Sequence, residues 1–174
     1  MIRSRIILFV GAAMLGLSAL AACGGSDDKP AAEKPAAAKK VEPCEPSPAT
    51  LSTSGVDGLG EIVVNGECRT VYTFDGDTAS PPKSNCVGQC ELRWTPVPSP
   101  QASSIEGIEL DLIGSIERPD GSSQITVKGW PIYYFAGDKE PGDVNGQGVG
   151  GKWWVMDTGG NAIHKKAADT SSVY

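Results

Sequence analysis

The chain has 174 residues, of which 40% are hydrophobic and 21% charged, and its formal net charge at pH 7 is −6. This acidic balance argues against binding to nucleic acid and against electrostatic adhesion to anionic lipid or polymer surfaces. It is compatible with cations, with basic partners, or with a charge that serves only solubility.

The N-terminal residues have the organisation of an export signal. A basic segment, Met1–Arg5, precedes the apolar run Ile6–Ala19, which is too short to span a bilayer as a mature helix. The sequence Leu20-Ala21-Ala22-Cys23 resembles the bacterial lipobox. The resemblance implies that residues 1–22 are a lipoprotein signal peptide, and that Cys23 carries a thioether-linked diacylglycerol after cleavage. The alternative is an ordinary signal peptide with a chance cysteine near its cleavage site.

Lipidation of Cys23 would decide where the protein works. Several acyl chains, palmitate among them, give a stable membrane anchor, whereas one chain alone binds only marginally. Cleavage removes Arg3 and Arg5, so that 15 basic and 21 acidic side chains become 13 and 21, a formal charge of −8. We therefore expect the chain on the extracytoplasmic face of the bacterial cell membrane or outer membrane, with the membrane as a partner and no nucleic acid.

Composition divides the rest of the chain. Residues 23–54 are rich in Ala, Pro, Lys and Glu and poor in large apolar residues, which predicts an extended, semi-rigid stalk. Residues 55–166 are enough for one modest core with disulfide support. The last segment, 167–174, is expected to be a loose tail.

The remaining cysteines support export. Without Cys23 there are four, an even number that favours disulfides in an oxidising compartment, and four cysteines allow three pairings. We favour Cys86–Cys90, because so short a loop closes easily, together with Cys44–Cys68. A zinc site or a haem attachment site is disfavoured, because Cys86 and Cys90 have three residues between them and no histidine follows.

The folded segment contains short strand patterns separated by turns. Strands are predicted in 61–64, 69–74, 124–127, 130–135 and 152–156, and one helical turn within 86–94. Asn65-Gly66 and Arg118-Pro119-Asp120-Gly121 are turn signals. Few segments have helical periodicity, so the predicted fold is mainly β: two similar antiparallel modules forming one pseudo-symmetric domain.

One short phrase occurs twice. Tyr72-Thr73-Phe74-Asp75-Gly76-Asp77 and Tyr133-Tyr134-Phe135-Ala136-Gly137-Asp138 share the order aromatic, any residue, aromatic, two further residues, Asp. A Trp follows each copy at nearly the same distance. These repeats, at about 60–98 and 113–157, are each expected to be one unit that cannot bury its apolar face alone.

The repeats, with Ser84-Asn85-Cys86-Val87-Gly88-Gln89-Cys90, Trp94-Thr95-Pro96 and Gly129-Trp130-Pro131-Ile132-Tyr133, carry a family resemblance. The sequence resembles the bacterial secreted-repeat lipoproteins, which have a tandem Tyr-x4-Asp motif and no established function. The resemblance implies a surface lipoprotein with two repeats and a disulfide between Cys86 and Cys90. It brings no catalytic residues. Thr95 departs from the usual Trp-Pro-Pro, and Cys44 and Cys68 are additions to the usual pattern.

The repeated motif permits two roles. In the first, which we favour, the aromatic residues pack the core and the two aspartates accept backbone N–H bonds at turns. In the second, related Tyr and Asp groups line a cleft between the modules that takes a cation or a small polar ligand. The motif residues concerned are Tyr72, Phe74, Asp77, Tyr133, Phe135 and Asp138.

The glycine-rich loop 138–148 is a candidate metal site. Asp138, Glu140, Asp143 and Asn145 supply oxygen atoms of the kind that Ca²⁺ prefers. The loop lacks the spacing and the terminal Glu of a calcium hand, and Lys139 puts a positive charge inside it. Tight turning of the backbone explains the glycines without a metal, and we favour this explanation.

Catalytic residues are few, and no catalytic constellation is found. His164 is the one histidine, and no Gly-x-Ser-x-Gly occurs. Trp130, Trp153 and Trp154 would suit a platform for a sugar ring or another planar ligand, although such residues are more often core. The sequence therefore favours a lipid-anchored, non-catalytic binding or envelope-interaction module. A metal-binding or redox-linked envelope protein and a purely structural envelope component are the alternatives.

Overall fold

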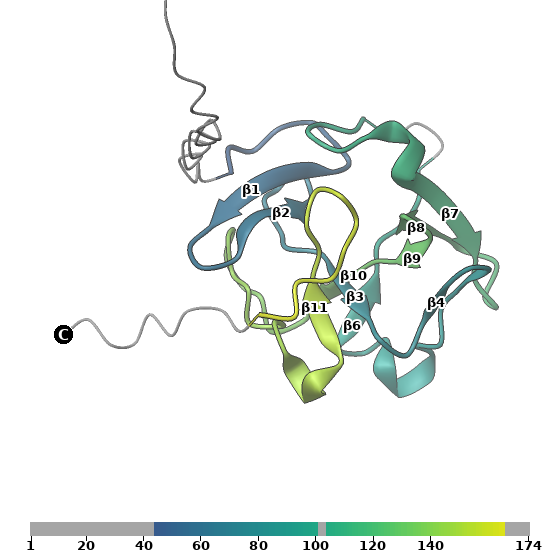
Figure 1. Cartoon of the computed structure of the whole chain (residues 1–174). Coiled ribbons are helices and arrows are strands. Elements are labelled where there is room, and N and C mark those ends of the chain that lie inside the picture. The colour runs from purple at the N-terminus through teal and green to yellow at the C-terminus, as the bar shows by residue number, and fades with distance from the viewer. Residues whose placement is uncertain (1–43, 101–103, 166–174) are drawn as a thin grey trace, which may run out of the picture. The chain divides into compact units, whose positions relative to one another are not determined.

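The computed structural model describes residues 44–100 and 104–165. The predicted signal peptide, Cys23, most of the predicted stalk and the C-terminal tail lie outside these residues. The described part is a mainly β domain with three short 3₁₀ turns (Figure 1), which confirms the predicted fold class. None of the helices in this part is long and apolar enough to cross a membrane.

Both repeats run through the same series of elements. Each opens with a hairpin, continues with a short strand carrying the repeated motif, and ends with a 3₁₀ turn and a last strand. In the first repeat these are β1 (Ser52–Val56), β2 (Gly60–Val64), β3 (Tyr72–Phe74), η1 (Gly88–Cys90) and β6 (Trp94–Pro96). In the second they are β7 (Ile113–Glu117), β8 (Ser123–Val127), β10 (Tyr133–Phe135), η3 (Val149–Gly151) and β11 (Trp153–Val155). The other elements are β4 (Thr78–Ala79), β5 (Pro82–Lys83), η2 (Leu110–Leu112) and β9 (Trp130–Pro131).

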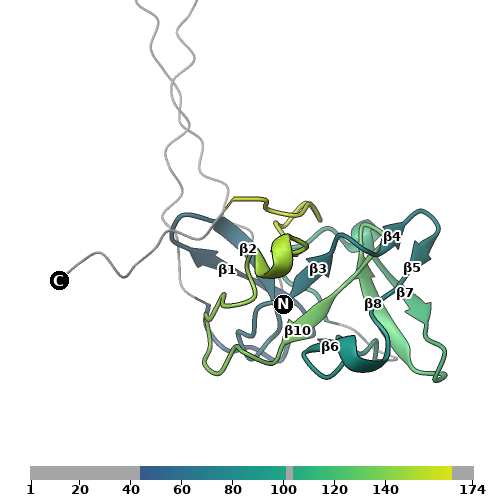
Figure 2. The same ribbon diagram turned by 90° about the horizontal axis from the view of Figure 1, so that it is seen from below.

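The repeats exchange their last strands. The central sheet has the order β11-β3-β10-β6 and is antiparallel at every pairing. The two motif strands β3 and β10 lie side by side in the middle of the domain (Figures 1 and 2), and each is flanked by the last strand of the other repeat. Aromatic residues of one repeat thereby face residues of the other: Tyr72 pairs with Tyr133, Phe74 with Trp153, and Phe135 with Trp94. Neither repeat can complete this sheet alone.

The core has two clusters of buried residues. Successive side chains point to opposite sides of an extended chain, so that Tyr72, the first residue of β3, belongs to one cluster and Val71, just before it, to the other. The first cluster is mainly aromatic and includes Trp94, Tyr133, Phe135 and Trp153. The second is mainly aliphatic and includes Leu51, Val63, Val97, Ile125, Ile132 and Met156.

The domain begins before the predicted boundary at residue 55. Leu51 is fully buried, the Ser47 N–H donates to the Gly66 carbonyl at 2.8 Å, and β1 starts at Ser52. The predicted boundary was wrong because β1 is a run of Ser, Thr and Gly that becomes a strand by pairing with β2. Similarly, no strand was predicted in residues 78–84, which contain the β4–β5 hairpin.

The structure has both favoured disulfides. Cys44–Cys68 ties the first described residue to the segment after β2, and Cys86–Cys90 closes the loop around η1. In the chain-entropy model, a loop as long as that between Cys44 and Cys68 is worth about 3 kcal/mol. The N-terminal end of the described domain is therefore covalently fixed to it.

Candidate functional site

The two Tyr-x4-Asp motifs form reciprocal hydrogen bonds. The Tyr72 hydroxyl donates to Asp138 Oδ2 at 2.7 Å, and the Tyr133 hydroxyl donates to Asp77 Oδ2 at 2.6 Å. Each tyrosine thus bonds the aspartate of the other repeat. Both tyrosines are fully buried and both aspartates nearly so. The predicted cleft lined by Tyr72 and Tyr133 is therefore not formed, and the motif lies inside the domain.

The second carboxylate oxygen of each aspartate holds a turn of its own repeat. Asp77 Oδ1 accepts the Asn85 N–H at 2.7 Å, and Asp138 Oδ1 accepts the Asn145 N–H at 2.9 Å. The favoured role of the aspartates, accepting backbone N–H bonds at turns, matches these contacts. The motif aspartates join the two repeats as well as ordering the loops that follow them.

Stacked rings surround these hydrogen bonds. Trp94 and Trp153 stack with 3.7 Å between ring centroids and an interplanar angle of 1°. Phe74 lies over Trp153 and Phe135 over Trp94, each with centroids 4.4 Å apart, so that four rings form a continuous stack. The phenylalanine rings also explain the glycine before each aspartate. A Cβ on Gly76 or Gly137 would come within 2.4 or 2.3 Å of the Phe ring two residues earlier.

The buried Arg118 of the second repeat bonds residues of the first. It is 4% exposed, donates to Gln124 Oε1 at 2.5 Å and to the Cys86 carbonyl at 2.9 Å, and forms an ion pair with Glu91. Its guanidinium also donates to Ser84 Oγ at 2.9 Å. A turn of the second repeat, predicted from the sequence only as a turn, is thus bonded to the disulfide loop of the first.

The glycine-rich loop does not gather its oxygen atoms around one point. Asp143 Oδ2 accepts the Lys139 and Glu140 N–H groups at 2.7 and 3.0 Å, and Asp138 bonds Tyr72 and Asn145. Within the described residues, no group of three or more His, Cys, Asp or Glu side chains is arranged to hold a metal ion. These carboxylates have internal partners, as expected for a loop that must turn tightly.

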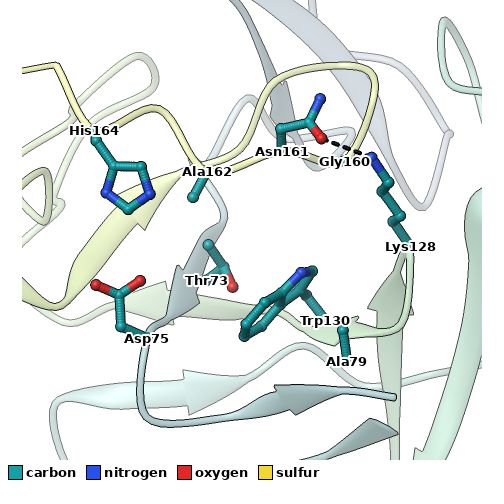
Figure 3. A pocket seen from close by; sticks show the side chains of 9 residues that line it. All are labelled: Thr73, Asp75, Ala79, Lys128, Trp130, Gly160, Asn161, Ala162 and His164. Carbon is teal, nitrogen blue, oxygen red and sulfur yellow. Dashed lines mark hydrogen bonds between the residues drawn. The ribbon is translucent and has the colours of Figure 1, made fainter. Parts of the chain in front are cut away.

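A pocket of about 420 Å³ opens beside β3, between the turn after β8 and the segment after β11. In Figure 3 the Trp130 indole lies across it from His164, Lys128 and Asn161 form one rim, and Asp75 stands at another. Thr73, Ala79, Gly160 and Ala162 complete its lining. It combines an indole, one cation, one anion, an amide and a hydroxyl, which is the composition of a site for a small polar ligand.

Two segments of the chain, residues 54–98 and 114–157, match the family model described as a secreted repeat of unknown function. The chain belongs to this family. No curated protein and no solved structure matches it. The secreted repeats of this chain agree with the predicted extracytoplasmic location and confirm the family resemblance.

The three tryptophans proposed as a platform of this secreted-repeat protein have different positions. Trp153 is core, and Trp154 donates from Nε1 to Asp75 Oδ2 at 2.8 Å while its ring contacts His164. Trp130 alone lines the pocket. Thr73, Lys128 and Asn161 were missed as site residues, because they come from a strand, a turn and a C-terminal loop that no local pattern connects. The Lys128-Gly129 turn between two predicted strands was the one signal available in the sequence.

The secreted-repeat motif also shifts the pKa values of its own groups. Burial raises the pKa of the Asp77 and Asp138 carboxyls, while the N–H and O–H bonds to each carboxylate act in the opposite direction. Burial, with the neighbouring aspartate, raises the pKa of Tyr72 and of Tyr133. The tyrosines are therefore fixed as neutral donors.

These shifts predict an acid-tolerant fold. A carboxyl whose pKa is higher in the folded than in the unfolded chain contributes stability that is complete below the unfolded pKa and lost as pH rises through the folded pKa. The free energy of unfolding of the wild type relative to Asp138→Asn should therefore grow from pH 7 to about pH 4. Asp120→Asn is the control whose difference should stay nearly constant over this range, because hydrogen bonds from Ser122 lower the pKa of Asp120 and its contribution is lost only as pH falls below about 4. Urea unfolding at both pH values measures the free energy of unfolding of the wild type and of each variant. If the difference between the wild type and Asp138→Asn shrinks on acidification, the raised pKa of Asp138 is contradicted.

Proposed function

We propose that this protein is a lipid-anchored extracytoplasmic binding module without catalytic activity. The lipid on Cys23 holds it to the bacterial membrane, and the pocket lined by Trp130 takes a small polar ligand. The observation that carries the binding role is this pocket, in which an indole, Lys128, Asp75 and Asn161 converge. The polar groups of the repeated motif are buried in mutual hydrogen bonds, so they serve the fold and leave binding to the surface.

The anchoring part of the proposal rests on the lipobox-like sequence before Cys23 and on the family's secreted character. The Cys44–Cys68 disulfide supports it mechanically, because a tether from Cys23 would end at a covalently fixed point of the domain. Pulling on the tether would not unravel β1, which begins a few residues later.

Cys23→Ala should move the protein from the membrane fraction to the soluble extracytoplasmic fraction. The physical reason is the loss of every acyl chain at once, since lipid modification begins at this sulfur. Cells are separated into membrane and soluble fractions, and the protein is detected in each fraction by immunoblot. The intact mass of the purified wild type shows the lipid. Cys90→Ala is the matched control, because that cysteine lies in the folded domain and should leave the protein membrane-bound. A wild type of unmodified mass in the soluble fraction would contradict the anchor.

The binding part is tested by thermal shift of the full-length protein with a panel of small polar compounds: neutral sugars, amino acids, nucleosides and carboxylates. At least one class should raise the melting temperature of the wild type and leave that of Trp130→Ala unchanged. Tyr134→Ala, a half-buried aromatic on the neighbouring strand β10, is the control that should keep the shift. Shifts that are equal in the wild type and Trp130→Ala, or none across the panel, would remove the binding role.

A further inference from the structure

We infer that the pocket lined by Trp130 is a saccharide site that takes one neutral pyranose ring. This inference rests on the proposed function and names its ligand class. Three features of the pocket carry it: a buried hydroxyl with no partner, a lysine held in an unfavourable backbone conformation, and a lining whose opposite charges balance.

The first feature is Thr73 on β3. Thr73 is 3% exposed. Among the buried side-chain oxygen and nitrogen atoms of the described residues, its Oγ1 is the one that has no hydrogen-bond partner. A buried hydroxyl left unbonded is destabilising, whereas Val has the same shape without that cost. The oxygen lies on the side of Thr73 that faces Trp130 (Figure 3). A ligand hydroxyl in the pocket would supply the missing partner.

The second feature is the turn that presents Lys128. Lys128 has φ 52° and Gly129 φ 81°, so both central residues of this tight hairpin turn are left-handed. Asn, Asp or Gly adopts that conformation at lower cost than Lys. Strain of this kind is concentrated at sites where the side chain is needed. A Cβ on Gly160 would approach the Lys128 Cβ to 2.7 Å, so the loop opposite is fitted closely to the lysine.

A chain of hydrogen bonds fixes the direction of the lysine. The Lys128 ammonium donates to Asn161 Oδ1 at 2.7 Å (Figure 3), and the Asn161 amide donates to Asp157 at 3.1 and 3.2 Å. Asp157 Oδ1 also accepts the Asn161 N–H at 2.8 Å. An ammonium has three donors, so Lys128 keeps donors for a ligand after bonding Asn161. The amide orientation is set by Asp157, which makes the rim preorganised.

The third feature is the charge balance of the lining. Lys128 and Asp75 contribute one charge of each sign from opposite parts of the pocket (Figure 3). The chain without residues 1–22 has a formal charge of −8. This net negative charge would repel an anionic ligand, and the Lys128 ammonium would repel a cationic one. A sugar hydroxyl both donates and accepts, so it can bond Asp75, Thr73 and Lys128 alike. The C–H face of a pyranose ring gives the indole of Trp130 an apolar surface to cover.

The size of the pocket agrees with one ring. Small-ligand pockets span about 300–1,000 Å³, and this one, at about 420 Å³, is near the lower end. Small residues keep it open: Ala79, Gly160 and Ala162 line it. A Cβ on Gly129 would come within 2.3 Å of the Ala79 carbonyl oxygen, so the turn after β8 packs closely against β4 beside the pocket.

The test uses full-length protein in micelles of a detergent without a sugar head group. Saturation-transfer NMR and calorimetry are run with glucose, galactose, mannose and N-acetylglucosamine, with their disaccharides, and with glycine and glutamine as zwitterions. Binding of at least one sugar is expected, with the strongest transfer to ring C–H protons. If a disaccharide binds more tightly than its monosaccharide, the natural ligand is part of a sugar chain. If the two bind equally, the natural ligand is a free monosaccharide.

Two variants separate a binding role from a structural one. Thr73→Val and Lys128→Asn should each weaken sugar binding at least tenfold and at the same time raise the melting temperature, because each relieves an unfavourable local feature. Trp130→Ala should abolish binding. Thr95→Val, on the exposed side of the adjacent strand β6, is the matched control and should change neither quantity.

The outcomes distinguish the inference from the function it rests on. Binding of glycine or glutamine, but of no sugar, in a manner dependent on Trp130 would overturn the saccharide class and leave the binding module intact. Sugar binding that survives Thr73→Val and Lys128→Asn would overturn the pocket as its site. Absence of Trp130-dependent binding by every class would overturn both.

Discussion

Trp153→Ala is expected to lower the free energy of unfolding by about 3–5 kcal/mol, the usual range for removal of a large buried aromatic. Trp153 is 6% exposed and stands in the middle of the four-ring stack, between Phe74 and Trp94, with Tyr133 edge-on to it. Its loss removes contacts to both repeats at once. The total free energy of unfolding of most small domains is only about 5–15 kcal/mol.

Urea unfolding followed by circular dichroism measures this loss. Trp154→Ala is the matched control, because Trp154 is on the same strand but is only half-buried and bonds the exposed Asp75. Its cost should be clearly smaller. Equal costs for the two variants would mean that the stacked rings do not join the repeats.

Breaking one of the reciprocal hydrogen bonds is the second large effect. Asp138→Ala should cost about 3 kcal/mol, because it leaves the buried Tyr72 hydroxyl without its acceptor and frees the Asn145 N–H. Tyr72→Phe should cost about 1–3 kcal/mol, because it leaves Asp138 Oδ2 without its donor and the Gly146 N–H without its acceptor. Asp77→Ala and Tyr133→Phe should have costs in the same ranges on the other side of the domain.

A double-mutant cycle isolates the bond between the repeats. Tyr72→Phe combined with Asp138→Ala should cost less than the two single changes together, with a coupling of about 1 kcal/mol or more. The cycle of Tyr72→Phe with Asp77→Ala, which joins the tyrosine to the aspartate of its own repeat, is the control and should give a smaller coupling. Additive costs across the repeats would contradict the reciprocal arrangement.

The sequence predicted the parts of the fold that depend on local pattern. Short runs of β-branched and aromatic residues bounded by turns predicted β2, β3, β8, β10 and β11, and the duplicated phrase predicted two similar modules. It could not give the exchange of β6 and β11, because which strand lies beside β3 depends on packing between residues far apart in the chain. The cross-repeat hydrogen bond of Tyr72 follows from that exchange, so it could not be read from the motif either.

The candidate site was harder to predict than the fold. Lys128, Thr73 and Asn161 lie far apart in sequence and meet only when the segment after β11 returns beside the turn of the second hairpin. The prediction placed the platform on three tryptophans and the cleft on two tyrosines. One of the tryptophans lines the pocket, and both tyrosines are core.

Because the repeats exchange their last strands, one repeat alone cannot form a complete domain. Each repeat supplies the outer strand of the other half of the sheet, so a single repeat would expose one side of its motif strand and leave its aspartate without a tyrosine. Exposed strand edges promote association with other chains. Two repeats are therefore the smallest complete domain of this kind.

The most direct test of this account is NMR observation of the hydroxyl protons of Tyr72 and Tyr133. Buried and bonded to carboxylates, both protons should exchange slowly enough with water to give separate downfield resonances, and each should show a nuclear Overhauser effect to the aspartate of the other repeat. Asp138→Asn should shift the Tyr72 resonance and leave that of Tyr133 in place. Hydroxyl protons in fast exchange with water, or effects confined to the aspartate of the same repeat, would contradict the exchanged arrangement.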